Sequence, residues 1–540
     1  MNRIVLLSLF LVGACRPKEP ADLLLHNGKI VTADESFSIH QTVVVKDGKI
    51  VAVGGNDLLD AYEAARVVDL EGKMAMPGFN DSHIHVRGRA RRAVDLTEAG
   101  SLTEIFGAVA AKAQELGEGE WVTGYGWSED QLEEKRRPLR FDLDEAAPDN
   151  PVILTRAGGH SSVANSMALE LAGVTAATPD PEGGVIEKND NGELNGIIRE
   201  RAGIVSRLVP EATPEELRES FTQALRDLLR LGITSIIQAG VPPGSYAEWE
   251  QVYSGHEELP RAAVQIRFRD PSAIAAFGRK TGDGDERLRV GAVKITVDGG
   301  FTGPAAYTLE PYKDQGDYRG KLNYTEEELR AMVKAGHEAG WQLGFHAIGD
   351  AAIVLTVDAF AEALDALPRD DHRHFLNHFT IMPPEETMEK MAAYDILIAQ
   401  QPNFTYTLEG RYAANLDGDR LEHNNPLRTP MERGIFVALG SDILPIGPMV
   451  GLYAAVTRKG ASGQVYGPEE KITMEEALVA YTAKAAYLTR EESIKGTLEP
   501  GKLADIIVLS DDLLTIDPEK ILDVEVLMTV VGGKVVYERR

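Results

Sequence analysis

The chain has a single cysteine among its 540 residues, so it cannot form an intramolecular disulfide bond. Its stability must come from the packed core and from any metal that it binds. Basic residues are also few, 56 Lys and Arg against 84 Asp and Glu, and the resulting net charge of −28 would repel phosphate backbones. No lysine- or arginine-rich stretch offsets this charge. We therefore expect no nucleic-acid partner.

Long hydrophobic runs are absent too. The most apolar segment, residues 4–12, is too short to span a bilayer and follows Arg3. It predicts a signal peptide over residues 1–14, and the small residues before Cys15 match a bacterial lipoprotein processing site. Cys15 would then be lipidated, residues 15–20 would form a tether, and lipid would anchor the protein on the periplasmic or cell-surface side of a membrane. A signal peptide with an incidental cysteine is the alternative.

The two ends of the chain carry β-hairpin patterns. Short alternating apolar runs, broken at Asn27-Gly28 and Asp47-Gly48, predict hairpins over residues 21–76. Residues 497–540 repeat this pattern, with Gly532-Gly533 between two such runs. We expect one small β-sandwich built from both termini.

The middle of the chain alternates apolar β-like runs with amphipathic helices, which is the pattern of βαβ units. Eight strands make a closed (β/α)8 TIM barrel over residues 77–496 the natural architecture of this α/β protein. The predicted strands are residues 76–81, 233–238, 263–268, 290–297, 342–346, 374–378, 396–400 and 435–440. The gap between the first two strands is far too long for a loop. We expect an inserted α/β subdomain over residues 88–230, which would lie over the carboxyl ends of the strands.

Histidines and one acidic residue follow or end several of these strands. His83 and His85 come after the first strand, where a period of two puts both imidazoles on the same side. Such a pair alone is incidental about as often as it binds a metal. His346 and His378 end two later strands, and Asp442 follows the last one. Since parallel strands of a barrel end at one face, these side chains are predicted to meet there.

Lys294 lies inside the fourth predicted strand, where a buried ammonium group is costly without a partner. A neighbouring carboxylate is one explanation. The other is that carbon dioxide has converted the amine to a carbamate, which is an anionic metal ligand.

This arrangement resembles the amidohydrolase superfamily, in the branch of N-substituted formamide deformylase-like enzymes (amidohydrolase family 3). That superfamily places His-x-His on strand one of a (β/α)8 barrel, Lys or Glu on strand four, His on strands five and six, and Asp on strand eight. The resemblance covers nearly everything after Ala21 and includes residues 75–85, 159–166, 183–186, 293–299 and 501–505. It implies that one or two divalent metal ions, expected to be Zn²⁺, are bound by His83, His85, Lys294, His346, His378 and Asp442. In this interpretation Lys294 is N6-carboxylated.

The expected reaction is hydrolysis of a C–N bond in a small amide, N-formyl, N-acyl or small-peptide substrate. Metal lowers the pKa of bound water to about 7, and Asp442 would be the catalytic residue that moves the water proton to the departing nitrogen. An esterase, lactonase or dipeptidase on the same centre stays an alternative, and so does a non-catalytic solute-binding lipoprotein. A homodimer is compatible with the sequence, which does not indicate the oligomeric state.

Four residues are candidates for substrate binding. His160 lies in a turn of the predicted insertion that could reach the metal, although a surface histidine that caps a helix fits the same pattern. Tyr125, Trp127 and Asp298 are weaker candidates, and a tryptophan is more often part of a core than of a pocket.

Overall fold

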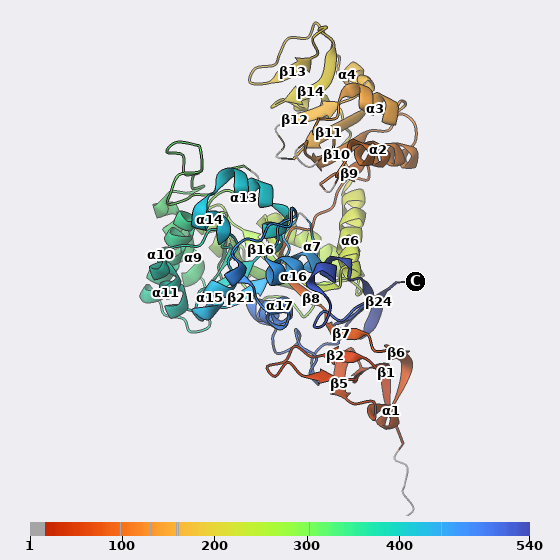
Figure 1. Ribbon diagram of the computed structural model, residues 1–540, viewed down its shortest axis with the longest axis vertical. Coiled ribbons are helices and arrows are strands. Elements are labelled where there is room, and N and C mark those ends of the chain that lie inside the picture. Colours follow the sequence, from red (N-terminus) through yellow and green to blue (C-terminus); the bar gives the residue numbers. More distant parts are fainter. Residues whose placement is uncertain are drawn as a thin grey trace, which may run out of the picture.

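The computed structural model describes residues 17–97, 99–129, 132–157, 159, 161–301, 303–443 and 445–539. The predicted signal peptide, Cys15 and His160 lie outside these residues. The chain has an α/β fold in which one group of elements extends at the top of Figure 1, a second occupies the middle and a third lies at the bottom. None of the helices in the described ranges is both long and apolar enough to cross a membrane.

Two four-stranded sheets, both entirely parallel, form the middle of the molecule. Their orders are β17-β16-β15-β8 and β18-β19-β20-β21. The strands are β8 (Phe79–Ile84), β15 (Ile233–Val241), β16 (Arg261–Arg267), β17 (Leu288–Lys294), β18 (Gly344–Ala347), β19 (Phe375–His378), β20 (Leu397–Gln400) and β21 (Val437–Leu439). Parallel bridges join the edges of the two sheets, Val293 with Leu343 at one edge and Ile84 with Asp442 at the other.

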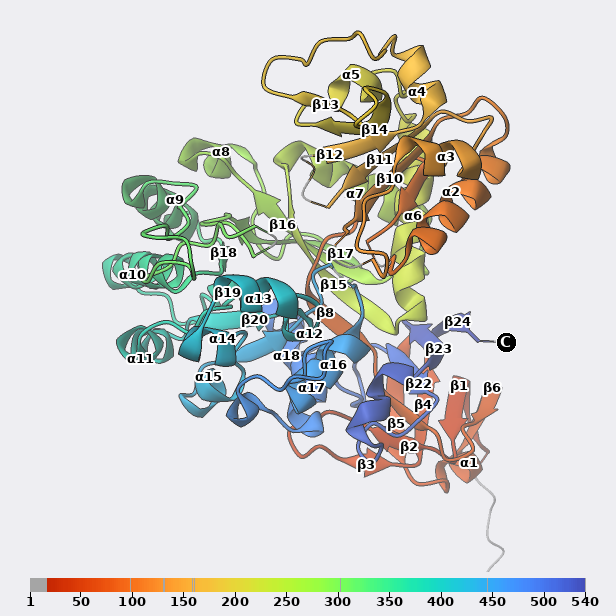
Figure 2. The ribbon, with the colours of Figure 1, turned by 45° about the horizontal axis from the view of Figure 1, so that its top comes forward.

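The strands of these sheets are buried on both faces, as the apolar runs in the sequence predict. Figure 2 shows the helices α9 to α11 side by side outside β18, β19 and β20. Covering and connecting helices are α6 (Pro214–Arg230), α7 (Tyr246–Gly255), α8 (Pro271–Ala276), α9 (Glu326–Glu338), α10 (Asp350–Ala366), α11 (Glu385–Ala393), α12 (Asn403–Thr407), α13 (Glu409–Asn415), α14 (Gly418–Glu422), α15 (Arg428–Glu432), α16 (Pro448–Thr457), α17 (Met474–Ala480) and α18 (Ala483–Leu488). Side chains of strands and helices share one continuous apolar core.

The first predicted strand, residues 76–81, is wrong as one element. The chain forms two strands there, β7 (Met74–Pro77) and β8, which belong to different sheets. Pro77 has no N–H group to continue the ladder, and a Cβ at Gly78 would lie 2.2 Å from the Thr234 side chain. The Pro77-Gly78 step therefore moves the chain from one sheet to the other.

Residues from both ends of the chain share the sheets at the bottom of Figure 1. The four-stranded sheet has the order β5-β4-β1-β6 and the six-stranded sheet has the order β24-β23-β22-β7-β2-β3. The strands are β1 (Glu19–His26), β2 (Lys29–Val31), β3 (Ile39–His40), β4 (Thr42–Lys46), β5 (Lys49–Gly54), β6 (Tyr62–Asp69), β22 (Ile506–Leu509), β23 (Val526–Val531) and β24 (Lys534–Glu538), and α1 (Leu58–Ala61) lies beside β6. Leu23, Val43, Ile506 and Val530 belong to one buried apolar cluster to which both sheets contribute.

The elements at the top of Figure 1 follow β8 in the chain and form a sheet of their own, with the order β13-β14-β12-β11-β10-β9. The strands are β9 (Ala93–Asp95), β10 (Val122–Trp127), β11 (Val152–Arg156), β12 (Ser161–Ala164), β13 (Val185–Lys188) and β14 (Leu194–Arg199), and the helices are α2 (Leu102–Leu116), α3 (Arg140–Ala146), α4 (Ser166–Leu171) and α5 (Gly203–Ser206). We call residues 93–206 the insertion.

Helix α6, which the sequence analysis groups with this insertion, packs elsewhere. Its apolar residues Phe221, Leu225 and Leu228 lie in the core shared by the parallel sheets. The carbonyl of Leu229 also accepts a hydrogen bond from Thr529 of β23. Helix α6 thus connects the insertion to the middle of the molecule.

Candidate metal centre

The six side chains that the sequence analysis groups together come from the carboxyl ends of strands in both parallel sheets. His83 is the fifth residue of β8, and His85 directly follows that strand. Lys294 ends β17, His346 lies in β18, His378 ends β19 and Asp442 comes shortly after β21. In (β/α)8 barrels the catalytic groups gather at the carboxyl ends of the strands.

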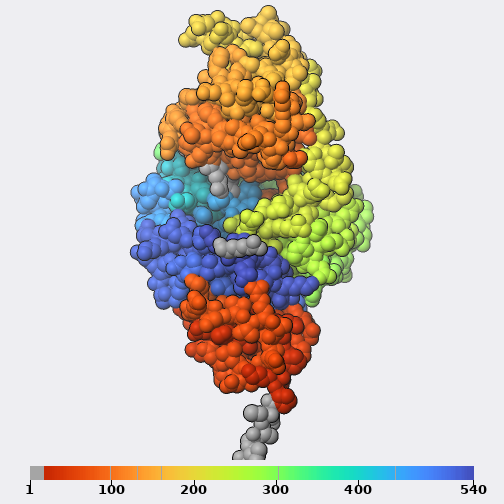
Figure 3. Space-filling view, turned by 90° about the vertical axis from the view of Figure 1, so that its right-hand side faces the viewer, coloured from red at the N-terminus to blue at the C-terminus, as the bar shows by residue number. Residues whose placement is uncertain are grey.

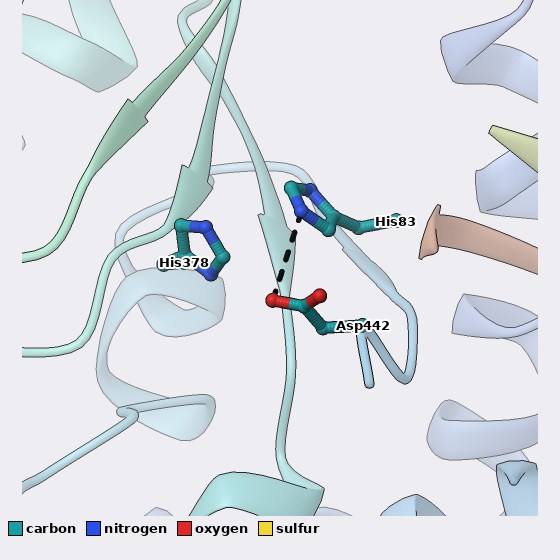
Figure 4. A group of neighbouring side chains, drawn as sticks. All are labelled: His83, His378 and Asp442. Carbon is teal, nitrogen blue, oxygen red and sulfur yellow. Dashed lines mark ion pairs between the residues drawn. The ribbon is translucent and has the colours of Figure 1, made fainter. Parts of the chain in front are cut away.

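His83, His378 and Asp442 form the compact part of this group. Each offers one ligand atom, and these atoms all lie within 4.8 Å of one another. Figure 4 shows the three side chains facing one another, with His83 Nε2 3.8 Å from Asp442 Oδ2. The remaining residues surround them. His85 Nε2 lies 3.6 Å from Asp442 Oδ1, and the rings of His346 and His378 have their centroids 4.4 Å apart.

Two residues of the cluster have a strained backbone. His378 has a φ of 82° and Asp442 has a φ of 59°, both in the left-handed region that non-glycine residues rarely adopt. Such conformations cost about 1–3 kcal/mol each and persist where the surrounding structure imposes them. The fold therefore holds these two residues in a destabilising backbone conformation that directs their side chains toward His83.

Burial determines the charges in the cluster. It lowers the pKa of His83 and His378 well below the ordinary value, and it lowers the pKa of His346 and of His85 to about 3, with the charge of Lys294 adding to the effect. These imidazoles are therefore neutral, which is the form that binds metals. Burial also lowers the pKa of Lys294, against the opposing charge of Asp442, and it raises the pKa of Asp442.

Within the described residues, several buried polar atoms of the cluster have no hydrogen-bond partner. They are His83 Nε2, His346 Nε2, His378 Nδ1, Lys294 Nζ and Asp442 Oδ1. An unpaired buried polar group costs about 1–3 kcal/mol. A cation bound among His83, His378 and Asp442 would account for the unpaired atoms of these three residues, and nitrogen and carboxylate donors are a set that a zinc-like ion takes.

Two hydrogen bonds fix how His83 faces the centre. His83 Nδ1 lies 2.5 Å from Asn377 Oδ1, and the Asn377 amide group donates to the Gly344 carbonyl at 2.9 Å. This second bond orients the amide, so its oxygen accepts from His83 Nδ1–H and leaves His83 Nε2 free for a metal. The sequence analysis missed Asn377. Its place one residue before His378 was the available signal.

Asp81 and Asp298 hold the surrounding backbone. Asp81 Oδ1 accepts from the backbone N–H groups of His83 and Ser441. Asp298 accepts from three backbone N–H groups, one of them that of Gly349 at 2.9 Å, and its Oδ1 lies 3.5 Å from His346 Nε2. Asp298 is fully buried. It therefore contacts a candidate metal ligand rather than an open pocket.

The other substrate-binding candidates lie in different surroundings. Tyr125 is exposed and lines a cavity of about 2270 Å³ that also reaches His85. Trp127 is fully buried in the apolar core of the insertion and does not line this cavity. The structure therefore corrects its prediction as a substrate-binding residue. His160 lies outside the described residues.

Comparison with known proteins agrees with this geometry. The profile of the Amidohydrolase family matches residues 66–537. The chain is 30% identical to the protein YtcJ of Bacillus subtilis over 95% of this chain and 99% of that one. It is also 30% identical to N-substituted formamide deformylase of Arthrobacter pascens, over 96% and 98% of the two chains. An uncharacterised metal-dependent hydrolase from Pyrococcus horikoshii has the same fold, with a TM-score of 0.70 and 24% identity over 92% of this chain and 99% of that one. The chain belongs to the amidohydrolase family.

Proposed function

We propose that the protein is a metal-dependent hydrolase that cleaves the C–N bond of a small amide, such as an N-formyl or N-acyl compound or a small peptide. The observation that carries this proposal is the close group of His83, His378 and Asp442 at the carboxyl ends of the strands, whose buried atoms His83 Nε2, His378 Nδ1 and Asp442 Oδ1 have no partner within the described residues. The relative named N-substituted formamide deformylase supports the choice of bond, since it aligns over nearly the whole of both chains.

We propose that the two parallel sheets form one closed (β/α)8 barrel over residues 77–496. The parallel bridges between Val293 and Leu343 and between Ile84 and Asp442 support closure, because they join both pairs of edge strands. Residues 21–76 and 497–540 would form the β-sandwich. The insertion would end near residue 206 rather than at residue 230, because α6 packs on the core of the parallel sheets.

We propose Zn²⁺ as the metal, as one or two ions, with Lys294 carboxylated. An unprotonated Lys294 amine can attack carbon dioxide, forming an N–C bond and releasing one proton. The lowered pKa and the unpaired Nζ atom of Lys294 both favour this reaction. The product is a carboxylate, which would serve as an anionic ligand beside the imidazoles of His83, His85, His346 and His378.

A bound metal would supply an activated water of pKa about 7 and would polarise the substrate carbonyl. Asp442 is placed to take the proton from the attacking water and to deliver it to the departing nitrogen. Its carboxylate faces the cluster next to His83 and His85. Asn377 keeps the His83 ring in one tautomer while this happens.

The test is a measurement of metal content together with an acyl-substrate screen. The purified protein is loaded with Zn²⁺ and assayed on N-formyl amines, N-acyl amino acids, dipeptides, esters and lactones. His83→Ala should lose both metal and hydrolysis, whereas His40→Ala, on the edge strand β3, should lose neither. A wild-type protein that takes up no metal, or that cleaves only esters and lactones, would contradict the proposal.

We also propose that the protein is a bacterial lipoprotein, anchored through Cys15 to the inner or outer membrane. It would lie on the periplasmic or cell-surface side. The apolar segment before Gly13-Ala14-Cys15 and the absence of any other cysteine support this location. The full chain expressed in a bacterium should incorporate radiolabelled palmitate, and Cys15→Ser should not. Equal labelling of the two would contradict it.

A further inference from the structure

The cavity beside the candidate metal centre is larger than one small substrate needs. Its volume is about 2270 Å³, whereas ligand pockets usually enclose about 300–1000 Å³. Residues of the insertion, such as Tyr125, and residues of the parallel sheets, such as His85 and Arg267, line it together. Figure 3 shows the molecule hollowed between the orange insertion and the segments below it. Substrate selection therefore depends on which side chains face this space next to the metal.

Arg267 is one of these side chains and lies close to the centre. It ends β16 and pairs in register with Lys294 of the next strand. A Cβ placed on Gly240 would lie 2.7 Å from Lys294 Cγ and 3.4 Å from an Nη atom of Arg267. The side chains of Lys294 and Arg267 thus both pass close to Gly240, whose φ of 101° favours glycine.

The guanidinium group of Arg267 is unpaired within the part of the chain that the structure describes. Among the described residues, no hydrogen bond or ion pair to it is found. Other arginines near the core are paired: Arg261 makes two bonds to Asp505, at 2.7 and 3.1 Å, and Arg289 lies 3.2 Å from Glu491.

Arg87 is in the same situation shortly after β8. It lies two positions after His85, lines the cavity, and has no ion pair within the described part of the chain. Two acidic residues of the cavity wall are engaged with other groups: Asp95 pairs with Arg89, and Glu409 accepts bonds from Ser462 and Tyr466. Within the described residues, the guanidinium groups of Arg267 and Arg87 are therefore unpaired positive charges on the wall that also includes His85.

We infer that Arg267 binds a carboxylate group of the substrate, so that the preferred substrates are N-acyl amino acids or small peptides with a free carboxylate rather than neutral amides. This inference rests on the proposed amide hydrolysis. A guanidinium group binds a carboxylate through two parallel N–H bonds, which orients the substrate as well as holding it. Arg87 adds a second positive charge shortly after the strand that carries His83.

The experiment compares two substrates that differ only in the carboxylate, N-formylphenylalanine and N-(2-phenylethyl)formamide, together with the matching N-acetyl pair. With the Zn²⁺-loaded full protein, kcat/KM should be about 10- to 100-fold higher for the acid of each pair. Arg267→Gln should lower kcat/KM for the acid and so remove most of this preference. For the neutral amide, kcat/KM should stay within about 2-fold of the wild-type value. Arg267→Lys should retain part of the preference, because lysine keeps the charge but not the planar fork.

Arg269→Gln is the matched control, because Arg269 is exposed two residues further along the same segment and is not part of the cavity wall. It should keep the wild-type preference. Circular dichroism melts should show that all three variants are folded, as expected for changes at exposed side chains. Equal rates for the two members of a pair, or a preference that Arg267→Gln leaves intact, would overturn the inference while the proposed function stands. Hydrolysis of no member of either pair, or of any other amide in the screen, would overturn the proposed function and this inference with it.

Discussion

Replacing Asn377 by leucine should weaken metal binding without removing any metal ligand. In the protein, the Asn377 amide is held by its bond to the Gly344 carbonyl and accepts from His83 Nδ1 at 2.5 Å. Leucine has a similar size but cannot accept this bond. The His83 ring could then take either tautomer and rotate, and the tautomer with a protonated Nε2 could not bind the metal through that atom.

The size of the effect follows from the contacts that are lost. Removal of an outer partner of a metal-binding histidine typically lowers metal affinity about 10- to 100-fold, which corresponds to about 1.4–2.7 kcal/mol. His83 Nδ1 loses its acceptor, while the Gly344 carbonyl keeps the Gln265 amide as a donor at 3.2 Å, so the free energy of unfolding of the metal-free protein should fall by about 1–3 kcal/mol. The two effects can be separated, because metal affinity is measured by Zn²⁺ binding to the folded protein and the free energy of unfolding is measured without metal.

The assay is a competition between the protein and a chromophoric chelator for Zn²⁺, with denaturant unfolding of the metal-free protein measured in parallel. Asn377→Asp is the informative companion, because its carboxylate still accepts from His83 and should preserve most of the affinity. The reasoning is refuted if Asn377→Leu binds Zn²⁺ as tightly as the wild type, or if Asn377→Asp and Asn377→Leu lose affinity equally.

Three further predictions concern single residues. Asp442→Asn should keep much of the Zn²⁺ and lose hydrolysis at least about 100-fold, because an amide cannot act as a base; activity near the wild-type level would remove Asp442 from this role. Lys294→Ala should lose activity that short carboxylic acids partly restore, and failure of rescue with metal still bound would count against a carbamate. Burial lowers the pKa of His374 in the folded protein, so the stability that its neutral form contributes is present above the unfolded pKa of about 6.5 and is lost as the pH falls below it. Between pH 6.5 and 5.5 this loss is about 1 kcal/mol, and metal-free His374→Gln should show a correspondingly shallower decline in denaturant unfolding; equal slopes for the two proteins would contradict the assignment.

Much of the architecture could be predicted from the sequence, because the strands of the parallel sheets are buried on both faces and read as apolar runs. All eight predicted segments contain a strand, and only the first was misjudged. There the apolar run continues without interruption through Pro77-Gly78, although the chain changes sheets at that step. The apolar pattern indicates only that residues are buried. Because β7 and β8 are both buried, the pattern could not show that they belong to different sheets.

The residues of the candidate site could be named from their places at strand ends, but their arrangement could not. The left-handed backbone of His378 and Asp442 depends on packing by neighbouring segments, and nothing in their local sequence indicates it. Asn377 was missed for a similar reason, since its role comes from a bond to His83 across 294 positions of sequence. Arg267 and Lys294 lie on adjacent strands, and only their register shows that they face the same space.

The pairing of β7 with β22 has a consequence for how the chain acquires its structure. The last strands complete a sheet that the first strands begin, and Lys29 contacts Asp512 across 483 positions. Contacts this distant form late in folding, since a long loop must close before they contribute. A polypeptide truncated before residue 506 would leave β7 with one open edge and the apolar side chains of β1 and β4 uncovered. A chain that lacks these last strands therefore cannot complete its fold, and we expect a prematurely terminated product to be degraded rather than to accumulate as a shorter enzyme.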